Sequence, residues 1–189
     1  RRAQNFLALL FAASAVMAAP AARADALDGV LEVRSAWATV EQGSLLLFAH
    51  VDYPVNDDIR AALKDGLTLT FDLDMVVTRE RRFWMDETVF EHTLRRELSY
   101  HAVSDKYLTR DLDLRSADQH RFATLEEALS ALGTVEALPI VTSLQLSANR
   151  EYRVSLRAGV RRGRLSDTLR VMLFWTDDWL RVSDWYSWS

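Results

Sequence analysis

A strict alternation of apolar and polar side chains over residues 67–77 constrains the fold of this chain more than any other feature. In LTLTFDLDMVV the apolar residues share one parity, and threonine or aspartate occupies most of the other. A period of two is typical of a β-strand with one buried face, because successive side chains point to opposite sides of a sheet. The segment YRVSLRAGVRR, residues 152–162, repeats the pattern with arginine at several polar positions. We therefore expect a sheet with one face against a core.

Other segments carry weaker versions of the same pattern. FEHTLRRELSY, residues 90–100, alternates loosely, but it also fits the start of a helix because Phe90, Leu94 and Leu98 are four residues apart. The remaining strand candidates are VLEVRSAWATV, SLLLFAHVDY, YLTRDLDL and IVTSLQLS. A turn at Gly43 would join the first two of these as a hairpin.

Two short helices are expected between the strands. Asn56 can cap NDDIRAALKDG, and Gly66 can end it. Thr124 and Glu127 form a capping box for TLEEALSALG, which stops at Gly133. The sequence therefore predicts a mainly β fold, as an antiparallel β-sandwich or a curled sheet with two short helices, with an α+β arrangement as the variant.

The N-terminal segment has the pattern of a cleaved signal peptide. Arg1 and Arg2 precede an uncharged apolar run over residues 6–19, and small residues at Ala22 and Ala24 predict cleavage between Ala24 and Asp25. The apolar run is short for a membrane span, so we expect none in the mature chain. We expect a signal peptide at 1–24, a single β-rich domain at 25–189, and a periplasmic or secreted protein exported by the general secretory or the twin-arginine route.

Charge and cysteine content exclude some functions. Removing residues 1–24 takes away three arginines and no acids, which changes the formal net charge from −4 to −7. An acidic chain is poorly suited to binding nucleic acid through phosphates, so no nucleic-acid partner is expected. The chain has no cysteine, so an exported form has no disulfide and depends on its core for stability.

The last sixteen residues, FWTDDWLRVSDWYSWS, contain four tryptophans. With TLRVMLFW before it, this segment predicts two strands joined by a turn at Thr176-Asp177-Asp178, apolar on both faces and hence inside a sheet. Aromatic residues at strand periodicity are usually packed, so Trp175, Trp179 and Trp185 are expected in the core. Trp188, beside the terminus, is the tryptophan expected to be most exposed.

These segments, taken in order, resemble a known family. GLTLTFDLDMVVTRERRFWMD, ELSYHAVSDKY, FATLEEALSALG and DDWLRVSDWYSW are similar, in order and spacing, to the proteobacterial secreted family called domain of unknown function 4390. The resemblance covers nearly all of the chain from Asp25 to Ser189. It implies export and no assigned activity, so no catalytic residue is carried over. It also implies a gene neighbourhood shared with a nitrogen-responsive sensor kinase, and thus a role close to envelope signalling.

A cluster of arginine and aromatic residues follows the clearest strand. TRERRFWMD places Arg79, Arg81 and Arg82 beside Phe83 and Trp84. Arginine near tryptophan is typical of protein interfaces and of anion sites. These five residues, together with Trp188, are our candidate partner-binding residues. The other interpretation is a solvated strand end, neutralised by neighbouring carboxylates. A second basic turn at Arg161, Arg162 and Arg164 is expected to be solvated.

Catalytic and metal signals are weak. Asp72 and Asp74 share a strand face, and Asp111 and Asp113 repeat the spacing, so these pairs are weak candidates for a cation or acid/base site. No histidine spacing typical of zinc occurs, and no nucleophile elbow, phosphate loop or dinucleotide motif is present. We expect no enzyme activity, no cofactor and no metal.

The sequence favours an exported β-rich module that binds an envelope or inner-membrane protein. The alternative is a protein that binds a small ligand or glycan through exposed aromatics such as Trp84 and Trp188. Cation-dependent hydrolysis through the aspartate pairs is the less favoured third hypothesis.

Overall fold

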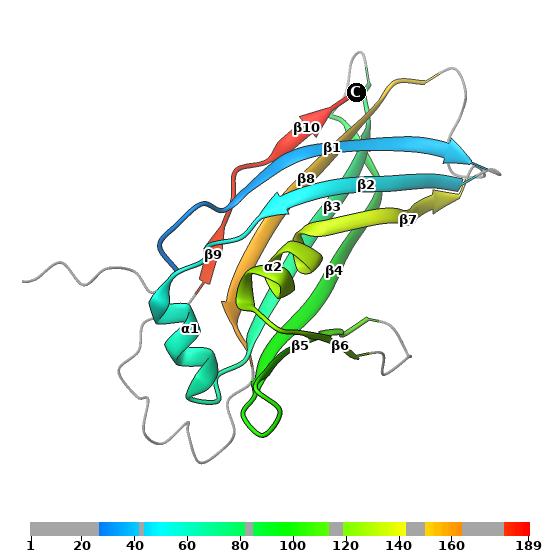
Figure 1. Ribbon diagram of the computed structural model, residues 1–189. Coiled ribbons are helices and arrows are strands. Elements are labelled where there is room, and N and C mark those ends of the chain that lie inside the picture. The colour runs from blue at the N-terminus through cyan, green and yellow to red at the C-terminus, as the bar shows by residue number, and fades with distance from the viewer. Residues whose placement is uncertain (1–26, 42–43, 82–84, 114–118, 143–149, 164–179) are drawn as a thin grey trace, which may run out of the picture.

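The computed structural model describes residues 27–41, 44–81, 85–113, 119–142, 150–163 and 180–189, which form two antiparallel sheets and two helices (Figure 1). The smaller sheet has the order β1-β2-β7 and contains β1 (Glu32–Glu41), β2 (Ser44–Asp52) and β7 (Thr134–Thr142). The larger has the order β10-β8-β3-β4-β5-β6, with β9 also paired to β8, and contains β3 (Leu69–Arg79), β4 (Glu87–His101), β5 (Lys106–Asp111), β6 (Gln119–Phe122), β8 (Tyr152–Arg162), β9 (Leu180–Val182) and β10 (Tyr186–Trp188). In Figure 1 the smaller sheet crosses the long strands of the larger one. The fold is mainly β, as predicted.

The alternation over residues 67–77 is confirmed by the position of β3. This strand pairs with β4 on one side and with β8 on the other, so it lies inside the larger sheet. Its odd-numbered side chains are buried, and they face the smaller sheet together with the inward residues of β8. Burying one such side chain is worth about 1.5–3 kcal/mol, so the two strands contribute a large share of the hydrophobic core. The shared core holds the two layers together.

The strand interpretation of residues 90–100 is confirmed, and the helical alternative is wrong. β4 pairs with β3 over nearly its whole length, with one register shift near Val77. Leu94 and Leu98 are both buried on the inner face of β4. Residues four apart share a face in a strand and also in a helix, so this spacing alone fits both structures. Only the pairing with β3 and β5 decides between the two structures.

Both predicted helices are present with the predicted caps. α1 (Asp57–Lys64) begins after Asn56, whose side chain accepts a hydrogen bond from the Ile59 backbone N–H. α2 (Leu125–Gly133) begins after Thr124, which forms the full capping box with Glu127. The side chain of Arg96 on β4 donates to the carbonyls of Leu132 and Thr134 and thereby satisfies the other end of α2. Neither helix is long and apolar enough to cross a membrane, and the described residues contain no other candidate.

The hairpin predicted around Gly43 is confirmed in its pairing. β1 and β2 are antiparallel, and Glu41 pairs with Ser44. Residues 42 and 43 themselves lie outside the described part of the chain.

The C-terminal strands differ from the prediction. β9 and β10 both pair with β8 and form an edge of the larger sheet, rather than its interior. Trp185 is 46% exposed, so its assignment to the core is wrong, whereas Trp188 is half-buried and packs against the core. Trp175, Trp179 and the turn at 176–178 lie outside the described residues.

A one-residue change of register between β9 and β10 explains why Trp185 is exposed while Trp188 packs against the core. Val182 pairs with Gly159 on the outer face, but Tyr186 pairs with Leu156 on the inner face, so the register changes by one between β9 and β10. Ser183 occupies the break: its backbone N–H donates to the Ala158 carbonyl at 2.8 Å, and its hydroxyl accepts from the Ala158 N–H at 3.0 Å. A one-residue slip moves every following side chain to the opposite face.

Candidate functional site

The predicted arginine surface is charge-balanced where the structure describes it. Arg79 and Arg81 both donate to the same oxygen of Glu87, and these two hydrogen bonds lower the pKa of the Glu87 carboxyl. Glu80 pairs with Arg153 on the neighbouring strand. Arg79, Arg81 and Arg153 therefore form ion pairs that link the ends of neighbouring strands. Arg82, Phe83 and Trp84 lie outside the described residues.

The aspartate pairs on the larger sheet face arginines rather than each other. Asp74 accepts from Arg157 at 2.9 Å and from the Thr93 hydroxyl at 2.8 Å. Asp72 accepts from Arg161 Nε at 2.7 Å. The described residues contain no group of three or more acids and histidines placed to hold a metal ion.

The second pair is divided between the two faces of the sheet. Asp111 is in register with Arg96, whose side chain is turned inward to α2. Asp113 instead lies 3.4 Å from the exposed Arg95 guanidinium and also accepts from the Arg95 backbone N–H at 2.8 Å. Arg161 of the second basic turn is held by Asp72, Arg162 also has a partner, and Arg164 lies outside the described residues.

The outer face of the larger sheet is consequently polar. Arginines of β8 alternate with carboxylates of β3, and Arg110 pairs with Glu97 across β4 and β5. The guanidinium of Arg157 also lies over the ring of Trp185, 4.6 Å from its centroid, and covers part of that exposed aromatic side chain. This surface has the composition of an ordinary solvated sheet face.

The outer face of the smaller sheet carries a group of apolar side chains beside polar ones such as Thr39, Ser44 and His50. We call Trp37, Leu46, Phe48 and Pro139 the aromatic face. Trp37 is paired with Phe48 across β1 and β2, and Leu46 is paired with Pro139 across β2 and β7. The Trp37 and Phe48 rings stack with centroids 5.3 Å apart and planes within 2° of parallel. In β2, the two neighbours of Phe48, Leu47 and Ala49, are buried and point to the core. Phe48 and the rest of the aromatic face therefore point away from the core.

Trp37 is 51% exposed although it is the largest side chain of this face. An exposed tryptophan stacked on a second ring presents a rigid apolar surface that loses little conformational entropy on binding. Large apolar side chains grouped on a surface are typical of interaction sites. The aromatic face is therefore the strongest candidate for a binding surface among the described residues.

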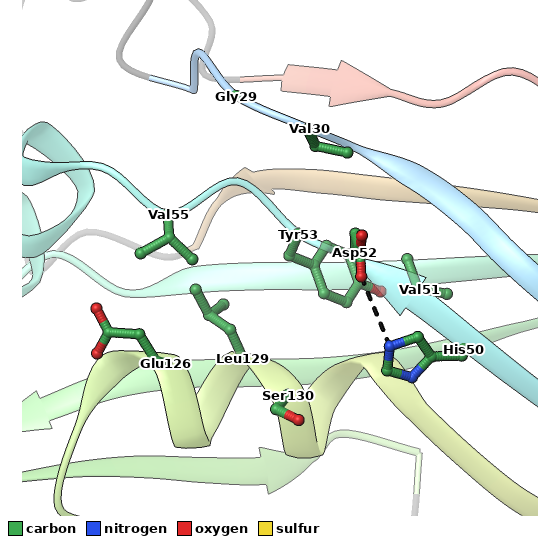
Figure 2. Close-up of a pocket in the computed structure, with 10 residues that line it drawn as sticks. All are labelled: Gly29, Val30, His50, Val51, Asp52, Tyr53, Val55, Glu126, Leu129 and Ser130. Atoms are coloured by element: carbon green, nitrogen blue, oxygen red, sulfur yellow. Dashed lines mark ion pairs between the residues drawn. The ribbon is translucent and has the colours of Figure 1, made fainter.

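An open groove continues from this face at the end of β2. The outward row of β2 runs from Leu46 and Phe48 to His50 and Asp52, and the last two line the groove. We call it the α2 groove, because α2 forms one wall while the segments around Val30 and Val55 form the other (Figure 2). Its volume is about 460 Å³. It is lined by Gly29, Val30, His50, Val51, Asp52, Tyr53, Val55, Glu126, Leu129 and Ser130.

Gly133 explains how α2 lies so close to β2. A Cβ atom at this position would be 2.1 Å from the Val51 carbonyl oxygen, so only glycine permits the approach. The close approach sets the position of the α2 groove wall relative to the outward row of β2. From the sequence, Gly133 is predicted only as a helix stop, and no local pattern indicates this contact.

The fold and these surfaces define a two-layer antiparallel β protein with one polar and one aromatic outer face. The family model of DUF4390, a domain of unknown function, matches residues 29–189, and the chain belongs to this family. Comparison with curated proteins and with solved structures found no match.

The aromatic face was missed by sequence reasoning for an identifiable reason. Trp37 and Phe48 occur in segments that alternate weakly, because both faces of these strands carry apolar residues. The cross-strand register that stacks the two rings is a tertiary property. The burial of the odd-numbered side chains of β2 in the structure is what shows that the even-numbered ones point outward. Trp188, a predicted binding residue, instead packs against the core.

Proposed function

We propose that the mature chain is an exported, non-enzymatic binding module that docks another protein of the cell envelope through the aromatic face. The observation that carries this proposal is the stacked pair of Trp37, which is 51% exposed, and Phe48 on the outside of the smaller sheet. Aromatic residues of this kind are enriched among the few residues that provide most of the binding energy of an interface.

The difference between the two outer faces supports a specific role for one of them. The larger sheet covers its outer face with ion pairs and partly covers Trp185 with Arg157. On the smaller sheet, the neighbour stacked on Trp37 is the apolar ring of Phe48 instead of a charged group. Exposed apolar surface lowers the solubility of a protein. A chain that keeps such a surface on one face only is therefore expected to use that face for binding.

The location in the envelope rests on sequence. The N-terminal segment has the composition of a signal peptide, and the resemblance to an exported family points the same way. An envelope partner is proposed on the basis of that location, and a partner involved in signalling on the basis of the family resemblance.

Binding of a small ligand is the second candidate function. The α2 groove favours it, because a volume of about 460 Å³ lies within the range typical of ligand sites. The groove is open to solvent, however, and His50 and Asp52 of its lining continue the outward row of β2 that carries Leu46 and Phe48, which suits a polypeptide better.

The test compares two tryptophans on opposite faces. In-cell crosslinking followed by mass spectrometry is carried out with the wild type, with Trp37→Ser and with Trp185→Ser. Both side chains are about half exposed, so neither substitution removes a core residue. We expect Trp37→Ser to reduce capture of the specific partner by about 30-fold, which corresponds to the roughly 2 kcal/mol of a binding hot spot.

Trp185→Ser serves as the control and should capture the partner as the wild type does. Equal capture by both variants would exclude the aromatic face. An additional Arg81→Ala variant tests the arginine surface predicted from sequence, and a loss of capture confined to that variant would move the docking surface to the β3–β4 end.

A further inference from the structure

The lining of the α2 groove combines apolar walls with acidic ends. Val30 and Val55, which are 52% and 43% exposed, line one wall, and the buried Leu129 lies in the α2 wall. Figure 2 shows Glu126 at one end of the groove and Asp52 with His50 at the other. Apolar side chains left exposed between two charged ends can accommodate a ligand that is apolar in its middle and charged at its flanks.

The charged side chains that line the groove are acidic, and each is paired with an arginine just outside the lining. Asp52 and Glu126 carry carboxylates, and no lysine or arginine is among the described residues that line the groove. The arginines that neutralise them, Arg34 and Arg60, are not part of the lining, and they hold the two carboxylates at 2.5 and 2.6 Å. The hydrogen bond from Arg60 also lowers the pKa of the Glu126 carboxyl.

His50 adds a third polar group at one end. Its Nε2 lies 3.6 Å from Asp52 Oδ1, and its side chain is about half exposed. The imidazole can donate to a carbonyl of a bound chain while Asp52 accepts from a cation. This end is therefore suited to a peptide backbone next to a basic side chain.

We propose that the α2 groove binds a short segment of the partner polypeptide in which an apolar side chain is flanked by lysine or arginine. This inference rests on the proposed function, because the groove continues the row of β2 that carries Leu46 and Phe48 of the aromatic face. The apolar side chain of the segment lies between Val55 on one wall and Leu129 on the other. The flanking cations lie near Asp52 and Glu126. The remainder of the partner covers Trp37 and Phe48.

The inference is tested with short fluorescein-labelled peptides that alternate leucine with lysine, with glutamine or with glutamate. Fluorescence anisotropy gives the affinity of each peptide for the purified mature protein. We expect the lysine peptide to bind at least about tenfold more tightly than the glutamine peptide, and the difference to shrink in about 0.3 M salt. Methyl NMR should place the largest shifts at Val30, Val55 and Leu129.

Charge variants identify the site. The double variant Asp52→Asn/Glu126→Gln should weaken binding of the lysine peptide about fivefold, as expected for exposed charges, and leave the glutamine peptide unchanged. The matched control, Glu97→Gln/Asp113→Asn, removes the same two charges from the larger sheet and should have little effect. If the first variant does not fold, Ser130→Arg places a cation in the exposed wall of the groove and should also weaken binding.

Equal affinity for the lysine and glutamine peptides overturns the inference, and so does an equal loss in the control variant. Methyl shifts confined to another surface overturn it as well. These outcomes leave the proposed function standing if Trp37→Ser still loses its partner in cells. Unchanged capture by Trp37→Ser rejects the proposed function independently of the peptide result.

Discussion

At the scale of single residues, Tyr53 is a polar group inside the core. Its ring contacts Phe71 edge-on with centroids 4.7 Å apart, and its hydroxyl has no hydrogen-bond partner among the described residues. Burial raises the pKa of Tyr53 to about 12, against a smaller opposing effect of the Arg96 guanidinium. A phenol without a partner in this position costs stability when it ionises.

The raised pKa predicts a loss of stability at alkaline pH. The neutral phenol is favoured in the folded state, so its contribution is fully present below about pH 10 and is lost as the pH rises through about 12. We expect the free energy of unfolding to fall by about 2–3 kcal/mol over this range from this group alone. Urea unfolding of the wild type and of Tyr53→Phe across the range measures the difference.

Tyr53→Phe should show a smaller decrease, and at neutral pH it should be as stable as the wild type or about 1 kcal/mol more stable, because it removes an unpaired buried hydroxyl. Parallel pH profiles of the two proteins would show that Tyr53 does not cause the alkaline loss. A clear destabilisation at neutral pH would show that the hydroxyl makes a favourable contact.

At the scale of elements, the placement of α2 on β2 depends on one glycine. A methyl group at residue 133 would lie 2.1 Å from a backbone oxygen, so the helix would have to move. Gly159 on β8 is different, because its nearest neighbour to an added Cβ is a Val182 methyl at 3.6 Å, an ordinary contact.

These contacts predict opposite results for two glycine substitutions. Gly133→Ala should lower the free energy of unfolding by about 1–3 kcal/mol, the usual cost of an overpacked site. Gly159→Ala should be neutral or slightly stabilising, because alanine is favoured over glycine in a strand interior. Denaturant unfolding of both variants measures this. Equal stability of the two proteins would mean that α2 does not pack on β2 as described.

The elements themselves were largely predictable from sequence, for local reasons. β3 and β8 have one buried face, so their composition alternates, and both helices carry cap residues at the required positions. The position of the C-terminal tryptophans was not predictable. It depends on the one-residue slip at Ser183, where hydrogen bonds to Ala158 interrupt the pairing with β8. A uniform parity along residues 180–188 therefore assigns Trp185 to the wrong face.

At the scale of the whole molecule, two sheets share one core but present unlike outer faces. The polar face was partly predictable, because the arginines and aspartates of β8 and β3 occupy the outward parity. The aromatic face depends on the pairing of β1 with β2 and of β2 with β7, so it required the structure. The α2 groove also depends on tertiary structure, because its walls come from three distant parts of the chain.

The central claim is that the aromatic face, and not the polar face, contacts a partner. The most direct measurement places a photo-crosslinking amino acid at Trp37 or at Phe48, and at the exposed Glu91 or Arg95 of β4 for comparison, followed by irradiation of cells and identification of the products. We predict one and the same envelope protein crosslinked from Trp37 and from Phe48, and no such product from Glu91 or Arg95. The same product from all four positions, or a product only from β4, would contradict the account.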